Sequence, residues 1–296
     1  MKHEPADKFQ LVTDKIIALL SAGVKPWVRP WHSASGASIY RNLASGNAYS
    51  GLNPLLCSID CATLGDFRPF FLTYMQGQAL GWQLQKGSRS TWLRWGGTVK
   101  KEKVNDAGET EIAYLGMSKW LGVFHISLFT DTGAQVSIEE LSAKYPSSVA
   151  PLNDNARDAA VDEYVTRTGA AISHGGDRAF YRPVSDSVHM PALETFENSA
   201  EYYATLMHEL THWTGHESRL ARDQSGGFGS AAYAYEELVA ELGAAFSCNE
   251  LGINSELPNH ASYIDSWLAK LKHDNKFFFR AAGAARSAYT FLHPAA

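Results

Sequence analysis

The feature that most constrains this chain is the stretch from Tyr203 to Trp213, which contains a His-Glu-x-x-His motif at positions 208–212. Because an α-helix turns once every ~3.6 residues, His208 and His212 project from one face and can hold one divalent ion together. Glu209 lies ~100° away around the helix, outside this ligand set but within reach of a water that the ion polarises. The motif therefore predicts a buried helix carrying a hydrolytic zinc site, with Glu209 as its general base.

A third protein ligand is expected, because catalytic zinc sites usually have three. Residues 235–246 read as a second helix, on which Glu237 and Glu241 lie four positions apart on one face. We expect Glu237 to bind the metal and Glu241 to orient a ligand imidazole from behind. Glu236 points elsewhere and is expected to be solvated or paired with a base. The alternative is a hydrogen-bonded patch around Glu209 on a surface helix, which the apolar flanks and the second acidic helix argue against.

The sequence determines the ends of the motif helix and the remaining catalytic groups less closely. Ser199 is a plausible N-cap and Gly215 a plausible stop. Spacing does not choose the residue that stabilises a developing oxyanion. The candidates are Tyr181, Tyr233, Tyr235 and His216.

The charge of the chain is unevenly distributed. The formal net charge is −5, but residues 1–130 carry 14 Lys and Arg against 9 Asp and Glu, whereas residues 131–296 carry 12 against 22. The basic half is the candidate for binding a polyanion. Three cysteines cannot form a disulfide framework, and their odd number favours a reducing cytoplasmic location. No apolar run approaches ~18 residues, so we expect no membrane span.

Cations alternate with tryptophans in the basic half. In residues 24–31 two prolines keep the backbone extended, so cations can meet phosphates while unstacked bases lie on the rings, at ~1–3 kcal/mol per base. Residues 82–95 repeat the pattern. The alternative is that Trp27 and Trp31 are core residues locked by the prolines. The candidate DNA-binding residues are Lys25, Trp27, Arg29, Trp31, Arg41, Trp82, Lys86, Arg89, Trp92 and Arg94.

The order of the predicted elements indicates an α+β protein of two domains. We expect an N-terminal mixed α/β domain over residues 1–130, a linker over 131–155 that contains Pro146 and Pro151, and a second domain over 156–296. Strand pairs about a turn are expected in residues 82–95 and 171–181. Helices are expected over residues 6–22, 54–62, 156–168, 259–274 with Asn259 as cap, and 277–292. A small sheet followed by the motif helix, the Glu helix and closing helices is a zincin-like plan.

With these motifs in view, the chain resembles the ArdC family of plasmid-borne antirestriction proteins over nearly its whole length. In the N-terminal half the resemblance rests on residues 23–27, 30–31, 40–43, 49–53 and 83–87. In the C-terminal half it rests on residues 208–216, 219–220, 228–230 and 235–242. Residues 123–128 depart from the family pattern, and this departure concerns the end of the first domain rather than the metal site.

The resemblance implies an N-terminal single-stranded-DNA-binding domain and a C-terminal zincin-like metallopeptidase domain with a gluzincin-type site. It also implies protection of incoming plasmid DNA from host restriction during conjugation. Zinc is the expected ion, and another divalent ion such as Mn²⁺ could occupy the site. The expected partners are single-stranded DNA and an unidentified protein substrate, for which a restriction-system component is a candidate.

Two other functions compete with this one. A non-proteolytic protein could coat single-stranded DNA and carry a structural or vestigial metal site. A structural zinc has no use for a general base and usually has four protein ligands, so Glu209 argues against this. A metal-dependent nuclease is less favoured, because nucleases usually rely on carboxylate-rich Mg²⁺ sites.

Overall fold

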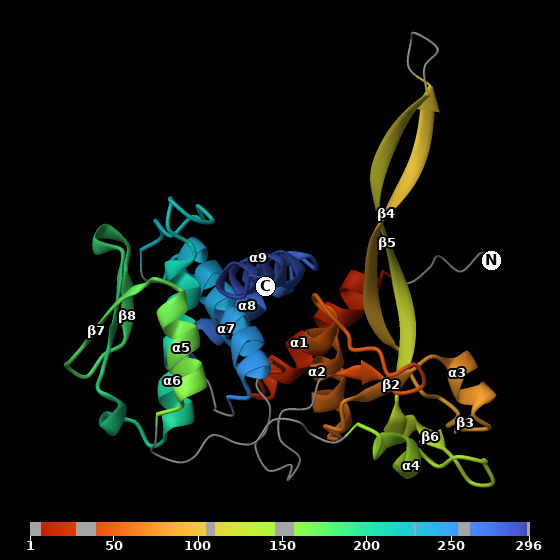
Figure 1. The fold of residues 1–296 in the computed structure, drawn as a ribbon. Helices are drawn as coiled ribbons and strands as arrows, with labels where there is room; N and C mark the ends of the chain where they lie inside the picture. The colour runs from red at the N-terminus through yellow and green to blue at the C-terminus, as the bar shows by residue number, and fades with distance from the viewer. Residues whose placement is uncertain are drawn as a thin grey trace.

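The computed structural model describes residues 7–27, 40–104, 110–145, 157–227, 229–253 and 261–294. For residues 97–104, 110–117 and 261–262 it describes the backbone alone. The chain has a two-domain α+β architecture (Figure 1). We refer to the described residues up to 145 as the N-terminal half and to those from 157 onward as the C-terminal half.

The N-terminal half combines helices with a mixed sheet. Its helices are α1 (Lys8–Ser21), α2 (Asn53–Leu64), α3 (Tyr74–Ala79) and α4 (Ile138–Ser142), with a 3₁₀ turn at Ile126–Leu128. Its strands are β1 (Arg41–Asn42), β2 (Phe70–Leu72), β3 (Gln83–Leu84), β4 (Thr91–Val104), β5 (Thr110–His125) and β6 (Phe129–Thr130). One sheet has the order β1-β2-β5-β4, with β1 parallel to β2 and the other neighbours antiparallel. Strands β3 and β6 form a separate antiparallel pair.

The β4–β5 hairpin extends far beyond the rest of the N-terminal half (Figure 1). It pairs continuously from Thr91 opposite Val123 to Val104 opposite Thr110. Its base is anchored by the Asn53 side chain, which donates to the Arg94 carbonyl at 2.9 Å and accepts from the Arg94 amide at 2.7 Å. The outer part therefore projects as a two-stranded ribbon from a fixed base.

The C-terminal half places a small sheet before a group of helices. Its helices are α5 (Ala159–Arg167), α6 (Ser199–Trp213), α7 (Ala231–Leu251), α8 (Ala261–Leu271) and α9 (Phe277–Leu292), with 3₁₀ turns at Pro183–Ser185 and Leu193–Thr195. Its strands are β7 (Ala171–His174), β8 (Phe180–Arg182) and β9 (Ser187–Met190). Strand β9 lies in the middle of this sheet, parallel to β7 and antiparallel to β8. Helix α6 follows the sheet and packs against it and against α7.

Most helix predictions are confirmed, with small shifts at the ends. The helices predicted over residues 6–22, 54–62, 156–168 and 277–292 correspond to α1, α2, α5 and α9. The N-cap of α6 is Asn198, whose side chain accepts from the Glu201 amide at 2.9 Å, and the predicted cap Ser199 is the first helical residue. The predicted cap Asn259 lies outside the described residues.

Two predicted hairpins are wrong. Strand β3 pairs with β6 and not with β4, although the two strands flank the expected turn around Gly87. Strands β7 and β8 flank Gly175 and Gly176, but β9 lies between them. The glycines mark the bends, while the partner of each strand is chosen by packing against segments distant in sequence.

Part of the predicted linker is folded. Helix α4 lies inside residues 131–155 and begins with a capping box between Ser137 and Glu140. Leu141 packs in a cluster with Trp82 and Phe129, so this segment completes the core of the N-terminal half. Residues 146–156 lie outside the described ranges.

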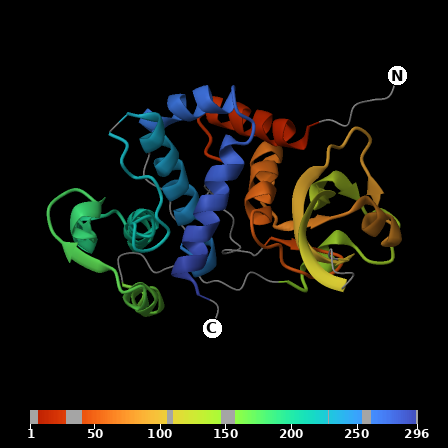
Figure 2. The same cartoon turned by 90° about the horizontal axis from the view of Figure 1, so that it is seen from above.

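The two halves share one hydrophobic core. Ile16 of α1 and Trp27 beyond it are buried together with Trp267 of α8 and Phe278 of α9. The Trp27 ring meets Trp267 edge-on with centroids 5.8 Å apart and stacks on Phe278 at 6.3 Å. Figure 2 shows α1 lying beside the C-terminal helices. The first helix therefore belongs structurally to the C-terminal half as much as to the sheet that follows it.

None of the helices in the described ranges is both long and apolar enough to cross a membrane.

The contact between α6 and α7 yields a test of the fold. A Cβ at Gly243 would lie 2.5 Å from Thr211 Cγ2, and Thr211 is fully buried with its hydroxyl donating to the Met207 carbonyl at 2.8 Å. Gly243→Ala should therefore lower the free energy of unfolding by ~1–3 kcal/mol through overpacking. Gly283→Ala is the matched control, because a Cβ there meets nothing within 4 Å and helix propensity should raise stability by up to ~1 kcal/mol. Urea denaturation measures both; equal stabilisation of the two variants would contradict the close helix contact.

Candidate metal centre

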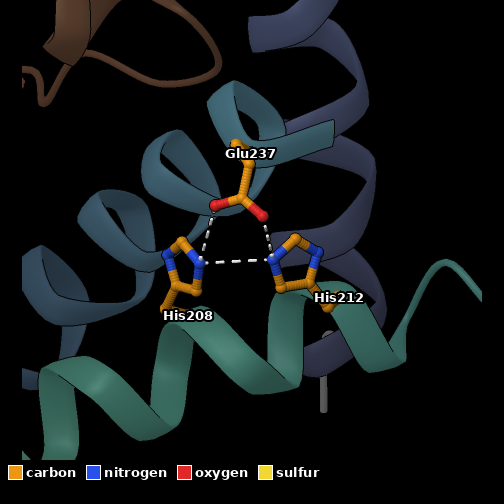
Figure 3. A group of neighbouring side chains, drawn as sticks. All are labelled: His208, His212 and Glu237. Atoms are coloured by element: carbon orange, nitrogen blue, oxygen red, sulfur yellow. Dashed lines mark hydrogen bonds and ion pairs between the residues drawn. The ribbon is translucent and has the colours of Figure 1, made fainter. Parts of the chain in front are cut away.

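Helices α6 and α7 bring three potential metal ligands together (Figure 3). The donor atoms of His208, His212 and Glu237 all lie within 4.8 Å of one another. The two Nε2 atoms are 3.2 Å apart, and each lies 3.6 Å from one carboxylate oxygen of Glu237. The three residues predicted as ligands are thus neighbours in the fold, although 25 positions separate His212 from Glu237.

The spacing fits a small divalent ion. Ligand atoms bound at ~2.0–2.2 Å around a tetrahedral zinc lie ~3.3–3.6 Å from one another. The separations within the cluster are 3.2, 3.6 and 3.6 Å. Two imidazoles and one carboxylate are also a donor set found in catalytic zinc sites, where the fourth position is left for water. The residues present therefore suit such an ion without rearrangement.

The electrostatic environment favours a cation at this position. His208 and Glu237 are 3% and 5% exposed. Burial lowers the pKa of His212, but the carboxylates of Glu236, Glu209 and Glu237 outweigh burial and hold this pKa above its ordinary value. Carboxylates that favour a positive imidazole also favour a divalent ion between the imidazoles.

Glu209 is buried on α6 beside the ligand cluster. It follows His208 on α6, is 7% exposed, and its charge acts on His212. A residue ~100° around the helix from the ligand face cannot easily bind the same ion, but its carboxylate can contact a water at the open position.

The carboxylate that orients His212 is Glu236 rather than Glu241. Glu236 Oε1 lies 3.2 Å from His212 Nδ1, which fixes the ring with Nε2 toward the metal position. Arg222 donates to Glu236 through Nη2 at 2.7 Å and Nε at 3.0 Å. Burial raises the pKa of Glu236, but the hydrogen bonds from His212 and Arg222 outweigh it and bring the pKa to about 2. The expectation of a paired base was correct for Glu236, and the expectation of solvation was wrong.

Gln224 fixes the same ligand from the loop that follows α6. Its Nε2 donates to the His212 carbonyl at 2.7 Å and to Glu236 Oε1 at 3.1 Å. Arg222 Nη2 donates to the Thr211 carbonyl at 2.6 Å. The loop therefore satisfies backbone carbonyls at the end of α6 and holds the imidazole of His212 at the same time.

Glu241 is fully buried and faces the N-terminal half. Its Oε1 lies 2.9 Å from Lys25 Nζ, and its Oε2 accepts from Trp27 Nε1 at 3.2 Å. Helical periodicity correctly places Glu241 on the face of Glu237, one turn further along. It could not show that a segment from the start of the chain covers that turn.

Tyr233 is the candidate oxyanion residue whose hydroxyl interacts with a member of the ligand set. It stands one turn before Glu237, and burial together with hydrogen bonds to Tyr263 and Glu237 raises the pKa of its hydroxyl. The other candidates contact residues away from the ligands: Tyr181 donates to Asp186, Tyr235 packs on Phe277, and His216 contacts Ser218.

The predicted DNA-binding residues fall into different environments. Lys25, Trp27 and Trp82 are held inside the fold, and Trp82 Nε1 donates to the Val136 carbonyl at 2.8 Å. Burial removes these side chains from a surface that DNA could reach, so for Trp27 the structure supports the core alternative. Lys86 and Arg89 are exposed, Arg41, Trp92 and Arg94 are partly buried, and Arg29 and Trp31 lie outside the described residues.

Folding assembles a cation–aromatic patch at the base of the hairpin. Arg94 lies over the rings of Trp120 and Phe9, at 4.8 and 5.2 Å from their centroids. Lys119 lies 5.0 Å from the centroid of Trp95, whose side chain is 46% exposed. Lys8 lies over Trp92 and Lys276 over Phe9, at 4.0 and 5.5 Å. The patch consists of Lys8, Phe9, Trp92, Arg94, Trp95, Lys119, Trp120 and Lys276.

The candidate DNA-binding residues chosen from the sequence leave out six members of this patch: Lys8, Phe9, Trp95, Lys119, Trp120 and Lys276. A signal was present in the hairpin. The pairs 94–95 and 119–120 are cation–aromatic dipeptides, and antiparallel pairing sets Arg94 opposite Trp120 and Trp95 opposite Lys119. The strands had been expected, but their register had not been derived.

The support of His212 by Glu236 can be tested through metal binding. Glu236→Gln keeps the size of the side chain but removes the negative charge at Nδ1, so affinity for Zn²⁺ should fall by about 10- to 100-fold. Glu217→Gln is the control, because Glu217 is exposed beyond the end of α6. Competition with a chromophoric chelator measures both; an affinity for Glu236→Gln within twofold of the unaltered chain would contradict the orienting role.

Comparison with known proteins agrees with both halves of the fold. A family model described as the N-terminal domain of anti-restriction factor ArdC matches residues 6–121. A second model, described as a zincin-like metallopeptidase, matches residues 159–284 and so includes all three candidate ligands.

Similar sequences align with nearly the whole of this chain. It is 35% identical over 300 residues to a DNA primase TraC of Escherichia coli, and the match spans 98% of this chain but 20% of that protein. A second Escherichia coli TraC is 34% identical over 95% of this chain and 26% of its own length. An uncharacterized protein of Sinorhizobium fredii, y4eC, is 34% identical over 98% of this chain and 92% of its own.

Two crystal structures of the antirestriction protein ArdC from plasmid R388, one metal-free and one with Mn(II), superpose with TM-scores of 0.74 and 0.73. Each is 34% identical, and the match covers 97% of both chains. The chain belongs to the ArdC family of antirestriction proteins.

Proposed function

We propose that this protein binds single-stranded DNA and hydrolyses peptide bonds at a zinc centre, and that it protects incoming plasmid DNA from host restriction during conjugation. The observation that carries the enzymatic part is the convergence of His208, His212 and Glu237 with Glu209 beside them. A merely structural metal site would need a fourth protein ligand and no adjacent base. The protein substrate is proposed to be a component of a restriction system.

The proposed chemistry assigns a separate task to each side chain. A bound zinc ion would supply Lewis acidity to the water and to the substrate carbonyl. His208, His212 and Glu237 would hold the ion, while Glu236 keeps the His212 ring oriented. Glu209 accepts the proton of the attacking water and then donates it to the leaving amine. Tyr233, next to Glu237, is placed to donate a hydrogen bond to the developing oxyanion.

Zinc is proposed over other ions on the basis of the donor set. Two imidazole nitrogens and one carboxylate oxygen at tetrahedral spacing suit Zn²⁺. The relative from plasmid R388 was crystallised with Mn(II), which supports a divalent ion in this family. Manganese would also accept these ligands, so the ion present can depend on supply.

The DNA-binding part of the proposal rests on the cation–aromatic patch. Exposed rings offer stacking platforms for unpaired bases, and adjacent cations can meet the phosphates. Trp95 and Lys119 lie on the open side of the hairpin, and the exposed Lys86 and Arg89 lie on the loop that leads into it. This placement replaces the buried Lys25 and Trp27 as the proposed centre of the DNA surface.

A second candidate function is protection by coating alone. The observation that favours it is that the patch is built by α1, β4, β5 and the residue preceding α9, none of which contributes a metal ligand. Coating would therefore need only the patch, while proteolysis would need Glu209.

Glu209→Gln should retain the metal but lose hydrolysis, because the ligand set is unchanged and the proton acceptor is gone. Cleavage of fluorescein-labelled casein, measured on protein loaded with Zn²⁺, should fall by at least about 10²-fold. Equal cleavage by both proteins would remove Glu209 from the mechanism. Glu217→Gln serves again as the matched control, since its carboxylate is exposed.

Trp95→Ala should weaken binding of an oligo-dT strand by about fivefold or more, because one stacked base is worth ~1–3 kcal/mol. Lys119→Gln should lower the salt dependence of binding by ~0.7 in log–log slope. Tyr74→Ala is the control, since Tyr74 on α3 is similarly exposed, at 45% against 46%. Fluorescence anisotropy between 50 and 200 mM salt measures these effects. If neither patch variant changes the affinity for oligo-dT or its salt dependence, the patch is not the DNA-binding surface.

Plasmid transfer into restricting and non-restricting recipients separates the two functions. The measured quantity is the frequency of plasmid transfer into the restricting recipient, relative to the non-restricting one. If proteolysis protects the plasmid, Glu209→Gln should lower this relative frequency while still binding DNA. If coating protects the plasmid, Glu209→Gln should leave the relative transfer frequency unchanged. Trp95→Ala combined with Lys119→Gln should lower it.

A further inference from the structure

A segment from the start of the chain reaches the helix that carries the third ligand. Helix α1 ends at Ser21, and Gly23 then adopts a left-handed conformation with φ of 76°, which turns the backbone toward the C-terminal half. In the residues that follow, Lys25 Nζ lies 2.9 Å from Glu241 Oε1, and Trp27 Nε1 donates to Glu241 Oε2 at 3.2 Å. Each oxygen of a buried acid on α7 is thus contacted by a side chain from the N-terminal half.

This contact is fixed from both sides. Trp27 is 5% exposed and packs on Trp267 and Phe278, while the Pro26 carbonyl accepts from Ser58 Oγ at 2.7 Å. The Lys25 side chain is 10% exposed and that of Glu241 is fully buried. Ordering and burial of both partners reduce the solvent screening that makes surface ion pairs weak.

Glu241 is close enough to the metal position for its charge to matter. It follows Glu237 by one helical turn on the same face, so the two carboxylates are ~6 Å apart at their Cβ atoms. Around the candidate site, four buried acids occur: Glu209, Glu236, Glu237 and Glu241. Arg222 supplies one compensating charge at Glu236 and Lys25 supplies another at Glu241. A divalent ion would supply two more.

We propose that Lys25 is a positioning residue of the metal centre: it orients the Glu241 carboxylate, and its own positive charge, which opposes that carboxylate, helps to set the affinity for the divalent ion. Lys25 holds the Glu241 carboxylate in place and offsets its attraction for the ion. The N-terminal half thereby contributes to a site whose ligands all belong to the C-terminal half. The inference rests on the metal centre proposed above, and it assigns a role in that centre to residues expected from the sequence to bind DNA.

The proposal predicts opposite effects for the two partners of one ion pair. Lys25→Met removes a positive charge near the ion and should tighten metal binding, whereas Glu241→Gln removes a negative charge and should weaken it. A unit charge acting on a divalent ion across about 10 Å, at an effective dielectric constant of about 20, changes affinity by roughly 300-fold before screening by salt, so shifts of about tenfold or more are expected in buffer. A merely structural ion pair would lower thermal stability in both variants and leave metal affinity unchanged.

The experiment is a metal titration of the full-length protein with Zn²⁺ alone, by competition with a chromophoric chelator, repeated with Mn²⁺ by electron paramagnetic resonance. The variants are Lys25→Met, Glu241→Gln, the double variant and Trp27→Phe, which keeps both charges and most of the ring packing. Lys15→Met is the matched control, since it breaks a partly buried ion pair with Asp60 inside the N-terminal half. Trp27→Phe loses a hydrogen bond to Glu241 but keeps both charges, so it should shift the Kd for zinc less than either charge variant. Lys15→Met should leave the Kd for zinc within about twofold.

The double variant keeps the test decisive if Lys25→Met does not fold, because it removes both charges together. It should bind zinc at least several-fold more tightly than Glu241→Gln alone. A double variant that binds no more tightly than Glu241→Gln, or single variants that both shift the Kd in the same direction, would overturn the proposal. If the unaltered chain does not bind zinc, the proposed metal centre itself is contradicted, and this result would be known before any variant is compared.

Discussion

The axial register between helices α6 and α7 is the constraint on which the candidate metal site depends. His208 and His212 lie on α6 and Glu237 on α7, so a shift of one residue along either helix would turn a ligand ~100° away from the others. The close contact of Gly243 with the buried Thr211 fixes this register, because Thr211 lies between the two histidines on α6 and Gly243 lies six residues beyond Glu237 on α7. Glycine is needed there because a Cβ would clash with the buried Thr211 side chain. The metal site is therefore a consequence of helix packing before it is a consequence of ligand chemistry.

Charge arranged around the ligands is the second requirement. Two buried acids beside the site contact a base, Arg222 at Glu236 and Lys25 at Glu241, and Glu237 lies among the candidate ligands. Burying several carboxylates costs free energy unless cations and hydrogen bonds compensate. Such an arrangement lets the protein fold while keeping a negative potential where a cation belongs. The fold accepts a local electrostatic cost that a bound ion would relieve.

Local patterns in the sequence allowed the cluster of candidate ligands and most helices to be predicted. The four-residue spacing of His208 and His212 implies a shared face in any helix, and Glu237 was found because catalytic sites of this kind need a third ligand. The sequence predicted Glu241 behind an imidazole, whereas Glu236 lies behind His212, because this choice depends on how the two helices cross. Periodicity describes the face of one helix and not the angle at which another approaches.

The proposed DNA surface was the hardest part to predict. Lys25 and Trp27 have the composition of a nucleic-acid-binding segment, yet they are inside because α1 packs on α8 and carries them with it. Cations beside aromatic rings suit a core anchor as well as a stacking platform, and composition alone does not distinguish the two. The cation–aromatic patch draws residues from position 8 to position 276, a combination that no local window contains.

The joint hydrophobic core bears on how this module can be combined with other proteins. Cutting between the halves would strip Trp27 from the pocket formed by Trp267 and Phe278 and expose apolar surface on both fragments. A gene fusion that keeps the module functional would have to carry both halves as one cassette. The TraC relatives fit this expectation, because the aligned region includes both halves within proteins about four to five times as long.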